Sequence, residues 1–230
     1  MAQAGYKQFC PIAMASEILC TRWTIVVLRE LLAGSTRFND LRRGVPKMSP
    51  TLLSLRLKEL ESSGVVERKA VNGENGVLEY HLTEAGRDLR PVIEAFGFWG
   101  QRWVESQPSL ENLDPSLLMW DMRRNLNPRP LPKRRTVVQF SYPDLPGSKR
   151  DWWLVIEPGG EVDLCWSDPG FDVDLYVTTD LRTMTAIWMG LTSVTKAGDR
   201  LVLDGDPDIA RTMQTWLGLS PFATETKQVV

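Results

Sequence analysis

The sequence lacks the features that mark membrane and secreted proteins. No apolar run approaches the roughly 20 residues that cross a bilayer, and residues 1–19 have neither the basic start nor the long apolar stretch of a secretion signal. Cysteine is scarce, and Cys10, Cys20 and Cys165 form an odd set without a CxxC pair. Neither a disulfide framework nor a zinc site is indicated. We therefore expect no membrane span and a cytoplasmic protein whose thiols are reduced.

Residue types that carry catalysis are also few. His81 is the only histidine, and we expect it at a paired surface position in a strand, which leaves no Ser–His or Cys–His dyad elsewhere. The sequence has no P-loop and no GxGxxG motif after a strand. Asp168, Asp172 and Asp174 lack the glycine and the terminal glutamate of an EF-hand calcium loop, and we interpret them as turn and strand-edge residues. The sequence predicts neither an enzyme nor a cofactor or metal site.

The charge is unevenly distributed along the 230 residues, which are enough for two domains of roughly 100 residues each. Residues 1–107 hold 14 Lys and Arg against 12 Asp and Glu, whereas residues 108–230 hold 13 against 17. Within residues 36–72 the balance is 8 to 4. Local positive charge is typical of a DNA footprint, and a solvated surface with a modest basic excess is the alternative.

The first half of the chain predicts short helices followed by a hairpin. Ser49 is a good N-cap with Pro50 behind it, and Gly64 is a helix stop. Two Asn-Gly pairs mark the turn between two alternating stretches. The predicted helices cover 11–19, 23–32, 37–43, 50–63 and 83–105, and the predicted strands cover 65–69 and 78–82.

The helix after Ser49 is amphipathic. Thr51, Ser54 and Lys58 fall on one face, and the opposite face carries leucines, namely Leu53, Leu57 and Leu60. A helix about 10–12 Å across fits the roughly 12 Å major groove of DNA, and a basic hairpin can lie on the flanking phosphates. This order of elements predicts a winged helix-turn-helix domain.

The character of the chain changes after Pro108. We expect a linker over 108–135, with a helix near 115–125, and a second domain over 136–230. The predicted strands of that domain cover 136–142, 152–157, 161–166, 174–178 and 200–204, and the predicted helices cover 180–190 and 206–218. The predicted class is therefore α+β in both domains.

Several motifs of residues 8–105 occur in the order of a known family. They are CPI at 10–12, RFNDLRR at 37–43, MSPTLLSLRLKEL at 48–60 and LTEAGRDLRPV at 82–92. The region closely resembles the HxlR family of bacterial transcription regulators. The resemblance implies a winged helix-turn-helix domain over 1–107 that serves both DNA binding and dimerisation. It also implies a homodimer on a pseudo-palindromic double-stranded DNA operator, with half-sites about 34–36 Å apart.

The resemblance assigns roles to polar residues of the first domain. Those expected at base edges or nearby phosphates are Ser49, Thr51, Ser54 and Lys58. Those expected on the DNA backbone are Arg42, Arg43, Lys47, Arg68, Lys69 and Asn72. For each single residue, a solvated polar side chain is the alternative.

The resemblance also implies that the first and last helices of this domain form the dimer interface. The last helix carries a continuous apolar stripe with spacings of 4, 3 and 4 residues, and the expected interface residues are Ile12, Val92, Phe96, Trp99 and Trp103. A stripe that packs within its own domain is the alternative.

Cys10 matches the N-terminal cysteine with which some members of the family sense oxidants or electrophiles. Lys7 is near it in sequence, and a helix N-terminus, which stabilises a thiolate, follows. A buried, inert thiol is the alternative.

The pattern of strands and helices over 136–220 resembles the sterol-carrier-protein fold, a small sheet covered by helices around an apolar tunnel. The resemblance implies that the second domain binds an apolar or lipid-like molecule. The expected pocket residues are Trp152, Trp166, Met184, Ile187, Trp188, Leu191, Met213 and Trp216. A filled core or a dimerising domain is the alternative.

We thus expect a sequence-specific transcription regulator whose operator affinity depends on a ligand of the second domain or on Cys10. The alternative is a carrier of lipids or other apolar small molecules whose N-terminal half serves mainly for dimerisation.

Overall fold

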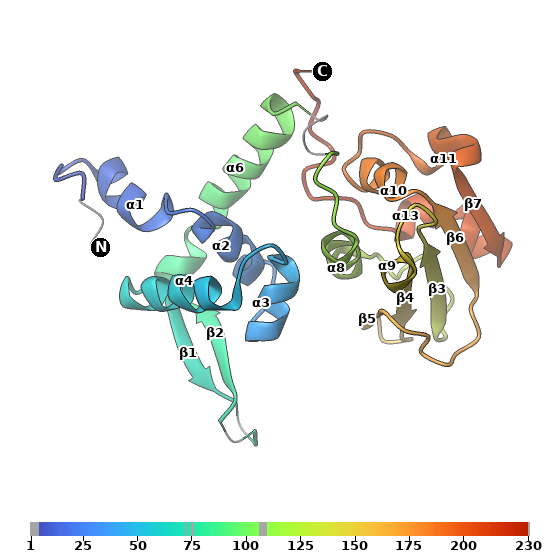
Figure 1. The fold of residues 1–230 in the computed structure, drawn as a ribbon, viewed down its shortest axis with the longest axis horizontal. Helices are drawn as coiled ribbons and strands as arrows, with labels where there is room; N and C mark the ends of the chain where they lie inside the picture. The colour runs from blue at the N-terminus through green and yellow to red at the C-terminus, as the bar shows by residue number, and fades with distance from the viewer. Residues whose placement is uncertain (1–4, 72, 75, 106–109, 230) are drawn as a thin grey trace. The chain divides into compact units, whose positions relative to one another are not determined.

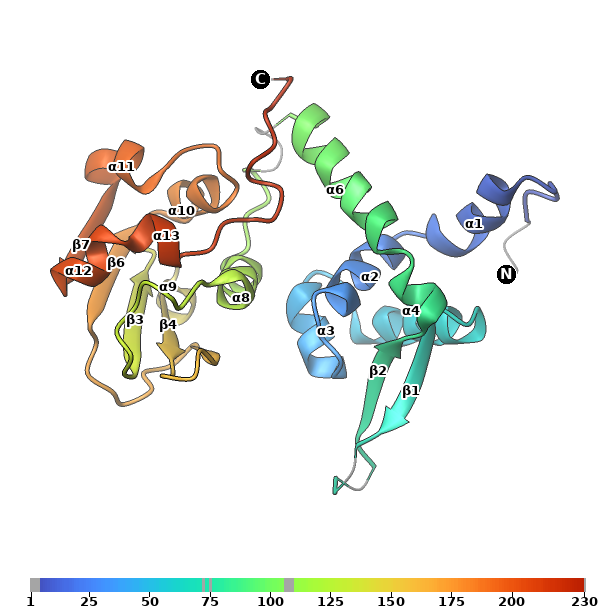
Figure 2. The ribbon, with the colours of Figure 1, turned by 180° about the vertical axis from the view of Figure 1, so that it is seen from behind.

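The computed structural model describes residues 5–71, 73–74, 76–105 and 110–229. It divides into two compact units, Met1–Gly97 and Phe98–Val230, and the boundary falls inside helix α6 (Figures 1 and 2). Both units contain helices and a sheet, so the predicted mixed α+β class is confirmed. In the described residues no single helix is long and apolar enough to cross a membrane, and α1 and α2 pass that test only together, as a pair bent by 83°.

The first unit consists of helices around a two-stranded hairpin. Its hydrophobic core consists of buried side chains from the helices and from the first strand, for example Val27, Leu28 and Leu57. The elements are α1 Pro11–Leu19, α2 Thr24–Leu32, α3 Phe38–Gly44, α4 Pro50–Ser62, β1 Val66–Ala70, β2 Leu78–Leu82, α5 Glu84–Arg87 and α6 Arg90–Trp103. Each of the predicted helices up to residue 63, and each strand, is present within one or two residues of its predicted bounds.

The single helix predicted over 83–105 is wrong, because the structure has two helices there. Thr83 Oγ1 accepts a hydrogen bond from Gly86 N–H at 3.2 Å and starts α5. The helix is interrupted by a turn at residues 88–89, and α6 begins at Arg90. Pro91 explains the break, since it has no N–H to donate to the carbonyl of Arg87 and its ring crowds the preceding turn.

A buried carboxylate joins α2 to α3. Glu30 has no solvent exposure and pairs with Arg29 at 2.5 Å, and the same guanidinium donates a hydrogen bond to the carbonyl of Gly44 at 2.9 Å. A Cβ atom placed on Gly44 lies 1.8 Å from a carboxylate oxygen of Glu30. Position 44 therefore has no room for a side chain.

The second unit is built on a five-stranded mixed sheet with the order β5-β4-β3-β6-β7. The central strand β3 pairs antiparallel with β4 and parallel with β6. The strands are β3 Thr136–Ser141, β4 Asp151–Ile156, β5 Val162–Cys165, β6 Leu175–Thr179 and β7 Leu201–Gly205. The helices are α8 Pro115–Asn125, α9 Gly147–Arg150, α10 Leu181–Trp188, α11 Val194–Ala197, the 3-10 helix η1 Gly198–Arg200, α12 Pro207–Arg211 and α13 Met213–Trp216.

Alternate residues of this sheet face a single core. Val138 lies opposite Leu154 and Leu175, and Phe140 lies opposite Trp152 and Val177 in the next row. These residues share one hydrophobic cluster with side chains of α8, α10, α12 and α13. Because successive strand residues point to opposite faces, these four helices cover one face of the sheet.

The single helix predicted over 206–218 is also wrong. Thr212 ends α12, and its hydroxyl donates to the carbonyls of Asp208 and Ile209 at 2.8 and 3.3 Å. Such side-chain bonds compete with the helical hydrogen bonds and bend the chain. A separate short helix, α13, follows.

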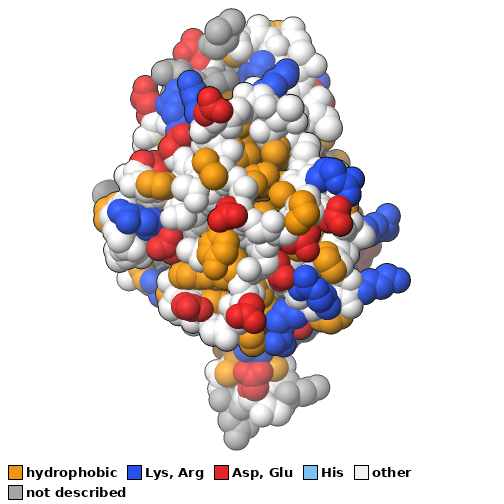
Figure 3. Space-filling model, turned by 90° about the vertical axis from the view of Figure 1, so that its right-hand side faces the viewer, with side chains coloured by type: hydrophobic (Ala, Val, Ile, Leu, Met, Phe, Trp, Pro, Cys, Tyr) orange, Lys and Arg blue, Asp and Glu red, His pale blue; other side chains and the backbone are white. Residues whose placement is uncertain are grey.

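The surface of the molecule mixes apolar and charged groups. Figure 3 looks onto the right-hand side of Figure 1 and shows hydrophobic side chains in the middle of that face, with acidic and basic side chains scattered around them. The large apolar side chains exposed in the strands and loops of the second unit are Val104, Trp166, Phe171, Tyr176 and Val202.

Candidate nucleic-acid interface

Helix α4 presents the polar face that its sequence predicts. Ser49 Oγ accepts a hydrogen bond from Leu52 N–H at 3.3 Å and thereby caps the helix. The leucine face is buried, and Leu57 is only 1% exposed. Thr51, Ser54 and Lys58 are exposed. The amphipathic orientation of this helix is therefore confirmed, and its hydroxyls and ammonium group are accessible.

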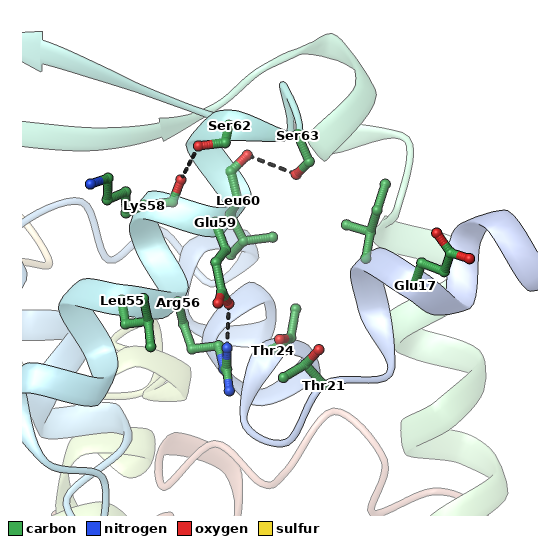
Figure 4. A pocket seen from close by; sticks show the side chains of 11 residues that line it. Glu17, Thr21, Thr24, Leu55, Arg56, Lys58, Glu59, Leu60, Ser62 and Ser63 are labelled. Atoms are coloured by element: carbon green, nitrogen blue, oxygen red, sulfur yellow. Dashed lines mark hydrogen bonds and ion pairs between the residues drawn. The ribbon is translucent and has the colours of Figure 1, made fainter. Parts of the chain in front are cut away.

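Arg56 fixes α4 to the rest of the unit and does not extend from its polar face. Its side chain is only 14% exposed and forms an ion pair with Glu59 (Figure 4). It also donates to the carbonyl of Arg22 at 3.2 Å. The next residue, Trp23, has a φ of 79°, a left-handed conformation that costs a bulky residue of order 1–3 kcal/mol. This strained turn places the Arg22 carbonyl where Arg56 reaches it.

A cleft of about 510 Å³ lies between α4 and the first two helices (Figure 4). Leu55 of α4 and Ile18 of α1 line it and are 48% and 40% exposed. Lys58 of α4 and Glu17 of α1 also line it. The remaining lining residues are Thr21, Thr24, Arg56, Glu59, Leu60, Ser62 and Ser63. The sequence pattern does not reveal this cleft, because its walls come from segments up to 46 positions apart.

The last turn of α3 and the loop that leads to α4 carry basic side chains. Arg42, Arg43 and Lys47 are all exposed. Arg43 forms an ion pair with Asp40 at 3.4 Å. These cations lie within a few residues of Ser49, at the positive end of the helix dipole, which favours an anionic partner.

The cations of the β1–β2 wing are paired with carboxylates. Arg68 contacts Glu61 at 2.8 Å, and Lys69 contacts Glu67 at 2.8 Å. The hydrogen bond from Lys69 holds the pKa of Glu67 below its usual value, and Glu61 raises the pKa of Arg68. A DNA phosphate that binds Arg68 or Lys69 therefore has to displace the carboxylate of Glu61 or Glu67. Asn72, also predicted at DNA, lies outside the described residues.

Arg37 holds the wing in place, a role that the sequence analysis missed. Its guanidinium contacts Glu74 at 2.7 Å and Glu79 at 3.3 Å. Partial burial works to raise the pKa of Glu79, but hydrogen bonds from Arg37 and His81 outweigh it and lower that pKa. His81 lies opposite Glu67 in the β1–β2 pair, and its Nε2 lies 3.1 Å from Glu79 on the same strand.

The expected dimer residues all lie on the surface. On α6, Phe96 is 54% and Trp99 62% exposed, and Ile12 of α1 is 77% exposed. Val92 and Trp103 are likewise exposed. Large apolar side chains with this much exposure commonly mark interaction surfaces.

Most of the expected ligand-pocket residues lie in the core of the second unit. Met184, Ile187, Met213 and Trp216 have no solvent exposure, and Trp152 is buried with them. Trp188 packs against this core from a half-buried position, and Leu191 is half-buried after α10. Trp166 lies outside the core and is 63% exposed. The structure thus brings six of these residues to one cluster.

The cysteines are free and lie apart in the sequence. Cys10 is the N-cap of α1 and is partly exposed, and Cys20 follows α1 at the surface. Burial raises the pKa of the Cys165 thiol, and Asp163 adds to this shift.

Two of the aspartates between residues 168 and 174 accept backbone hydrogen bonds. Asp168 accepts from Gly170 N–H at 2.8 Å, and Asp174 accepts from Val137 N–H at 2.8 Å. The described residues contain no cluster of acidic, histidine or cysteine side chains suited to a metal ion.

Comparison with known proteins identifies the first unit. The HxlR-like helix-turn-helix family matches residues 18–108. The helix-turn-helix transcriptional regulator YdeP of Bacillus subtilis is 36% identical over 102 residues, which cover 44% of this chain and 80% of YdeP. The chain belongs to the HxlR-like helix-turn-helix family. YvaP of the same organism is 36% identical over 100 residues, which cover 43% of this chain and 93% of YvaP.

Solved structures of regulators match a similar share of this HxlR-type chain. The reduced form of the transcriptional regulator YodB from B. subtilis is 32% identical, with a TM-score of 0.37, and the match covers 43% of this chain and 98% of YodB. The redox regulator HypR in its reduced form is 30% identical, with a TM-score of 0.38, and the match covers 45% of this chain and 100% of HypR. The family match ends at residue 108.

Proposed function

We propose that this chain is a sequence-specific transcription regulator that binds a pseudo-palindromic operator as a homodimer. The observation that carries the proposal is the outer face of α4, where Thr51, Ser54 and Lys58 are exposed while Leu57 is buried behind them. Short hydroxyl and ammonium side chains on an exposed helix can donate to and accept from base edges in the major groove.

The surrounding cations position this helix on the duplex. Arg42, Arg43 and Lys47 precede it, and Arg68 and Lys69 project from the wing. Contacts of this kind go to phosphates and fix orientation without reading sequence. Each phosphate that the protein neutralises lowers the log–log salt slope of affinity by about 0.9.

The homodimer is proposed to form through the exposed apolar residues of α1 and α6. Phe96, Trp99 and Ile12 present large side chains to solvent in the single chain. Covering such groups stabilises association by roughly 25 cal/mol per Å² of apolar surface. In a dimer with a two-fold axis through this interface, each of the two α4 helices would bind one half-site of the operator.

The second unit is proposed to bind an apolar or lipid-like effector, as in the sterol-carrier-like fold that its sequence resembles. Support comes from four helices on one face of the mixed sheet and from the methionines and tryptophans between them. The buried indole N–H of Trp188, at the end of α10, has no hydrogen-bond partner in the described structure, and a polar group of a ligand can accept it. An effector that favours a dimer with misaligned α4 helices releases DNA in proportion to its differential affinity for that form.

Oxidation of Cys10 is proposed as a second input. Its position at the N-cap of α1 puts the sulfur beside a helix N-terminus and next to the exposed Ile12. Oxidation of this partly exposed thiol would change the charge and shape of the α1 surface.

Two measurements test the function. Fluorescence anisotropy with the chain's own upstream DNA, at several salt concentrations, is expected to show nanomolar affinity and a log–log slope of about −0.9 per phosphate contacted. Native mass spectrometry of freshly purified protein is expected to show a dimer. A retained lipid together with equal affinity for all DNA sequences contradicts the regulator and favours the lipid-carrier alternative.

A further inference from the structure

A cavity of about 570 Å³ lies in the second unit beside the N-terminal half of α10. Cavities of roughly 300–1,000 Å³ accommodate small organic ligands. Its lining comes mainly from α10, α11 and η1. The lining residues are Leu110, Asp180, Arg182, Thr183, Ala186, Thr192, Lys196, Ala197 and Arg200.

The charge of this cavity contrasts with that of its unit. Residues 98–230 contain 14 Lys and Arg against 18 Asp and Glu, yet the cavity wall carries three cations and one carboxylate. That carboxylate, Asp180, accepts from Thr183 N–H at 2.8 Å and from Thr183 Oγ1 at 2.6 Å. Its oxygens therefore serve to cap α10, and the positive groups dominate the space.

Two of the three cations also have no acidic partner among the described residues. Some other basic residues of the unit form ion pairs, as in Arg134–Asp174 and Arg135–Glu157. Lys196 and Arg200 form no such pair, although both line the same cavity. Arg182 of α10 lines the same cavity, and its guanidinium donates to the carbonyl of Leu110, another lining residue, at 3.2 Å.

We propose that this cavity binds a small organic anion, whose carboxylate or phosphate group is held by Lys196 and Arg200 together with Arg182. Ammonium and guanidinium groups form short, charge-assisted hydrogen bonds with both kinds of oxyanion. The hydroxyl of Thr192 is a further donor beside them, and Leu110 and Ala186 offer apolar surface to the rest of the ligand.

Helix α10 takes part both in the cavity and in the hydrophobic core of the unit. Helix α10 forms a cavity wall through Arg182 and Ala186, and its other face places Met184 and Ile187 in the hydrophobic core. The proposal thus deepens the proposed function of this unit, on which it rests, by giving the effector a negative charge. Binding of the anion does not require DNA. The anion site and the DNA-binding function can therefore be tested independently of each other.

Isothermal titration calorimetry on the full chain tests the proposal with three probes: inorganic phosphate, hexanoate and the neutral hexanamide. The variant Lys196→Gln with Arg200→Gln removes the two unpaired cations. The matched control, Lys149→Gln with Arg150→Gln, removes two exposed cations of the same unit at α9. We expect hexanoate or phosphate to bind the unmodified chain and the control within about twofold of each other, and the cavity variant at least about tenfold more weakly.

Hexanamide is expected not to bind measurably, because it lacks the charge that the cations recognise. Stronger binding of phosphate than of hexanoate assigns the site to phosphorylated ligands, and the reverse assigns it to carboxylates. Equal weakening in both double variants, equal binding of hexanoate and hexanamide, or absence of binding by both anions overturns the proposal. Thermal melts of both variants check that they fold. Anion binding by a chain that ignores its upstream DNA contradicts the regulator but leaves this site intact.

Discussion

The two units of the chain differ in what they leave at the surface. Residues 1–97 carry 13 Lys and Arg against 11 Asp and Glu, and apolar side chains such as Ile12, at 77% exposure, stand in solvent. Residues 98–230 carry an excess of acidic residues and enclose large side chains such as Trp216, which has no exposure. The first unit thus presents surfaces suited to large partners, a duplex and a second copy. The second unit buries the largest side chains of its core, leaves a few aromatic groups such as Trp166 exposed, and offers a small basic cavity.

The two units are expected to unfold independently, because each has its own hydrophobic core. Leu57→Ala removes a side chain that is 1% exposed in the first core, and we expect the free energy of unfolding of that unit to fall by about 2–5 kcal/mol. Differential scanning calorimetry should show one transition moved and the other unchanged. Leu55→Ala is the control, because Leu55 is 48% exposed and its truncation should change stability by under about 0.5 kcal/mol. A single transition that shifts as a whole contradicts separate cores.

The exposed apolar stripe of α6 is the part of the first domain that we propose to form the dimer interface. Phe96→Glu puts a charge into the proposed dimer interface, and the dimer dissociation constant should rise about 30-fold or more, as when a central apolar side chain of an interface is truncated. Light scattering coupled to size-exclusion chromatography measures the mass. Val202→Glu is a matched control, since Val202 is 56% exposed on β7 in the second unit and lies outside the proposed interface. Equal behaviour of the two variants argues against α6 as the interface.

The packing of α2 on α3 gives a smaller effect. Gly44→Ala places a methyl group 1.8 Å from the carboxylate of Glu30, which is fully buried and bound to Arg29. We expect the first unit to lose about 1–3 kcal/mol of stability, measured by urea unfolding. Gly147→Ala in the second unit should be close to neutral, because its added Cβ meets open space. A neutral Gly44→Ala shows that the Glu30 contact relaxes freely.

The thiols provide the smallest difference between the units. Because burial and Asp163 raise the pKa of Cys165, a smaller fraction of it is thiolate at pH 8, and iodoacetamide should modify it several-fold more slowly than the exposed Cys20. The modification rate of Cys165 should continue to increase as the pH rises above 8, because more of its thiol becomes thiolate. Peptide mass spectrometry measures both rates. If Cys10 reacts no faster than Cys165, its proposed sensing role is wrong.

Local patterns in the sequence predict most of the first unit and part of the second. The N-cap Ser49 and the leucines behind it determine where α4 begins and which face is exposed, and both depend only on neighbouring residues. The breaks after Asp88 and at Thr212 were missed because the periodic apolar pattern continues across them. Pro91 was a visible signal for the first break, since proline removes a helical hydrogen bond.

Features made by distant segments were not predictable from such patterns. The pairing of Arg37 with Glu74 and Glu79 joins residues about 40 positions apart. The basic cavity assembles from Leu110, α10 and η1 only when the chain folds. Trp166 looks like a core residue by type, but at the end of β5 it is exposed, because β5 is an edge strand of the sheet.

The central claim is that the outer face of α4 reads DNA sequence, and one competition measurement tests it most directly. The triple variant Thr51→Ala, Ser54→Ala, Lys58→Ala is compared with the unmodified chain for affinity to its own upstream DNA and to a scrambled duplex of equal length. These side chains are exposed, so the fold should persist. Our account predicts that the specificity ratio falls by at least about tenfold, because each side chain that reads a base contributes about 1–3 kcal/mol of discrimination. An unchanged ratio contradicts the account.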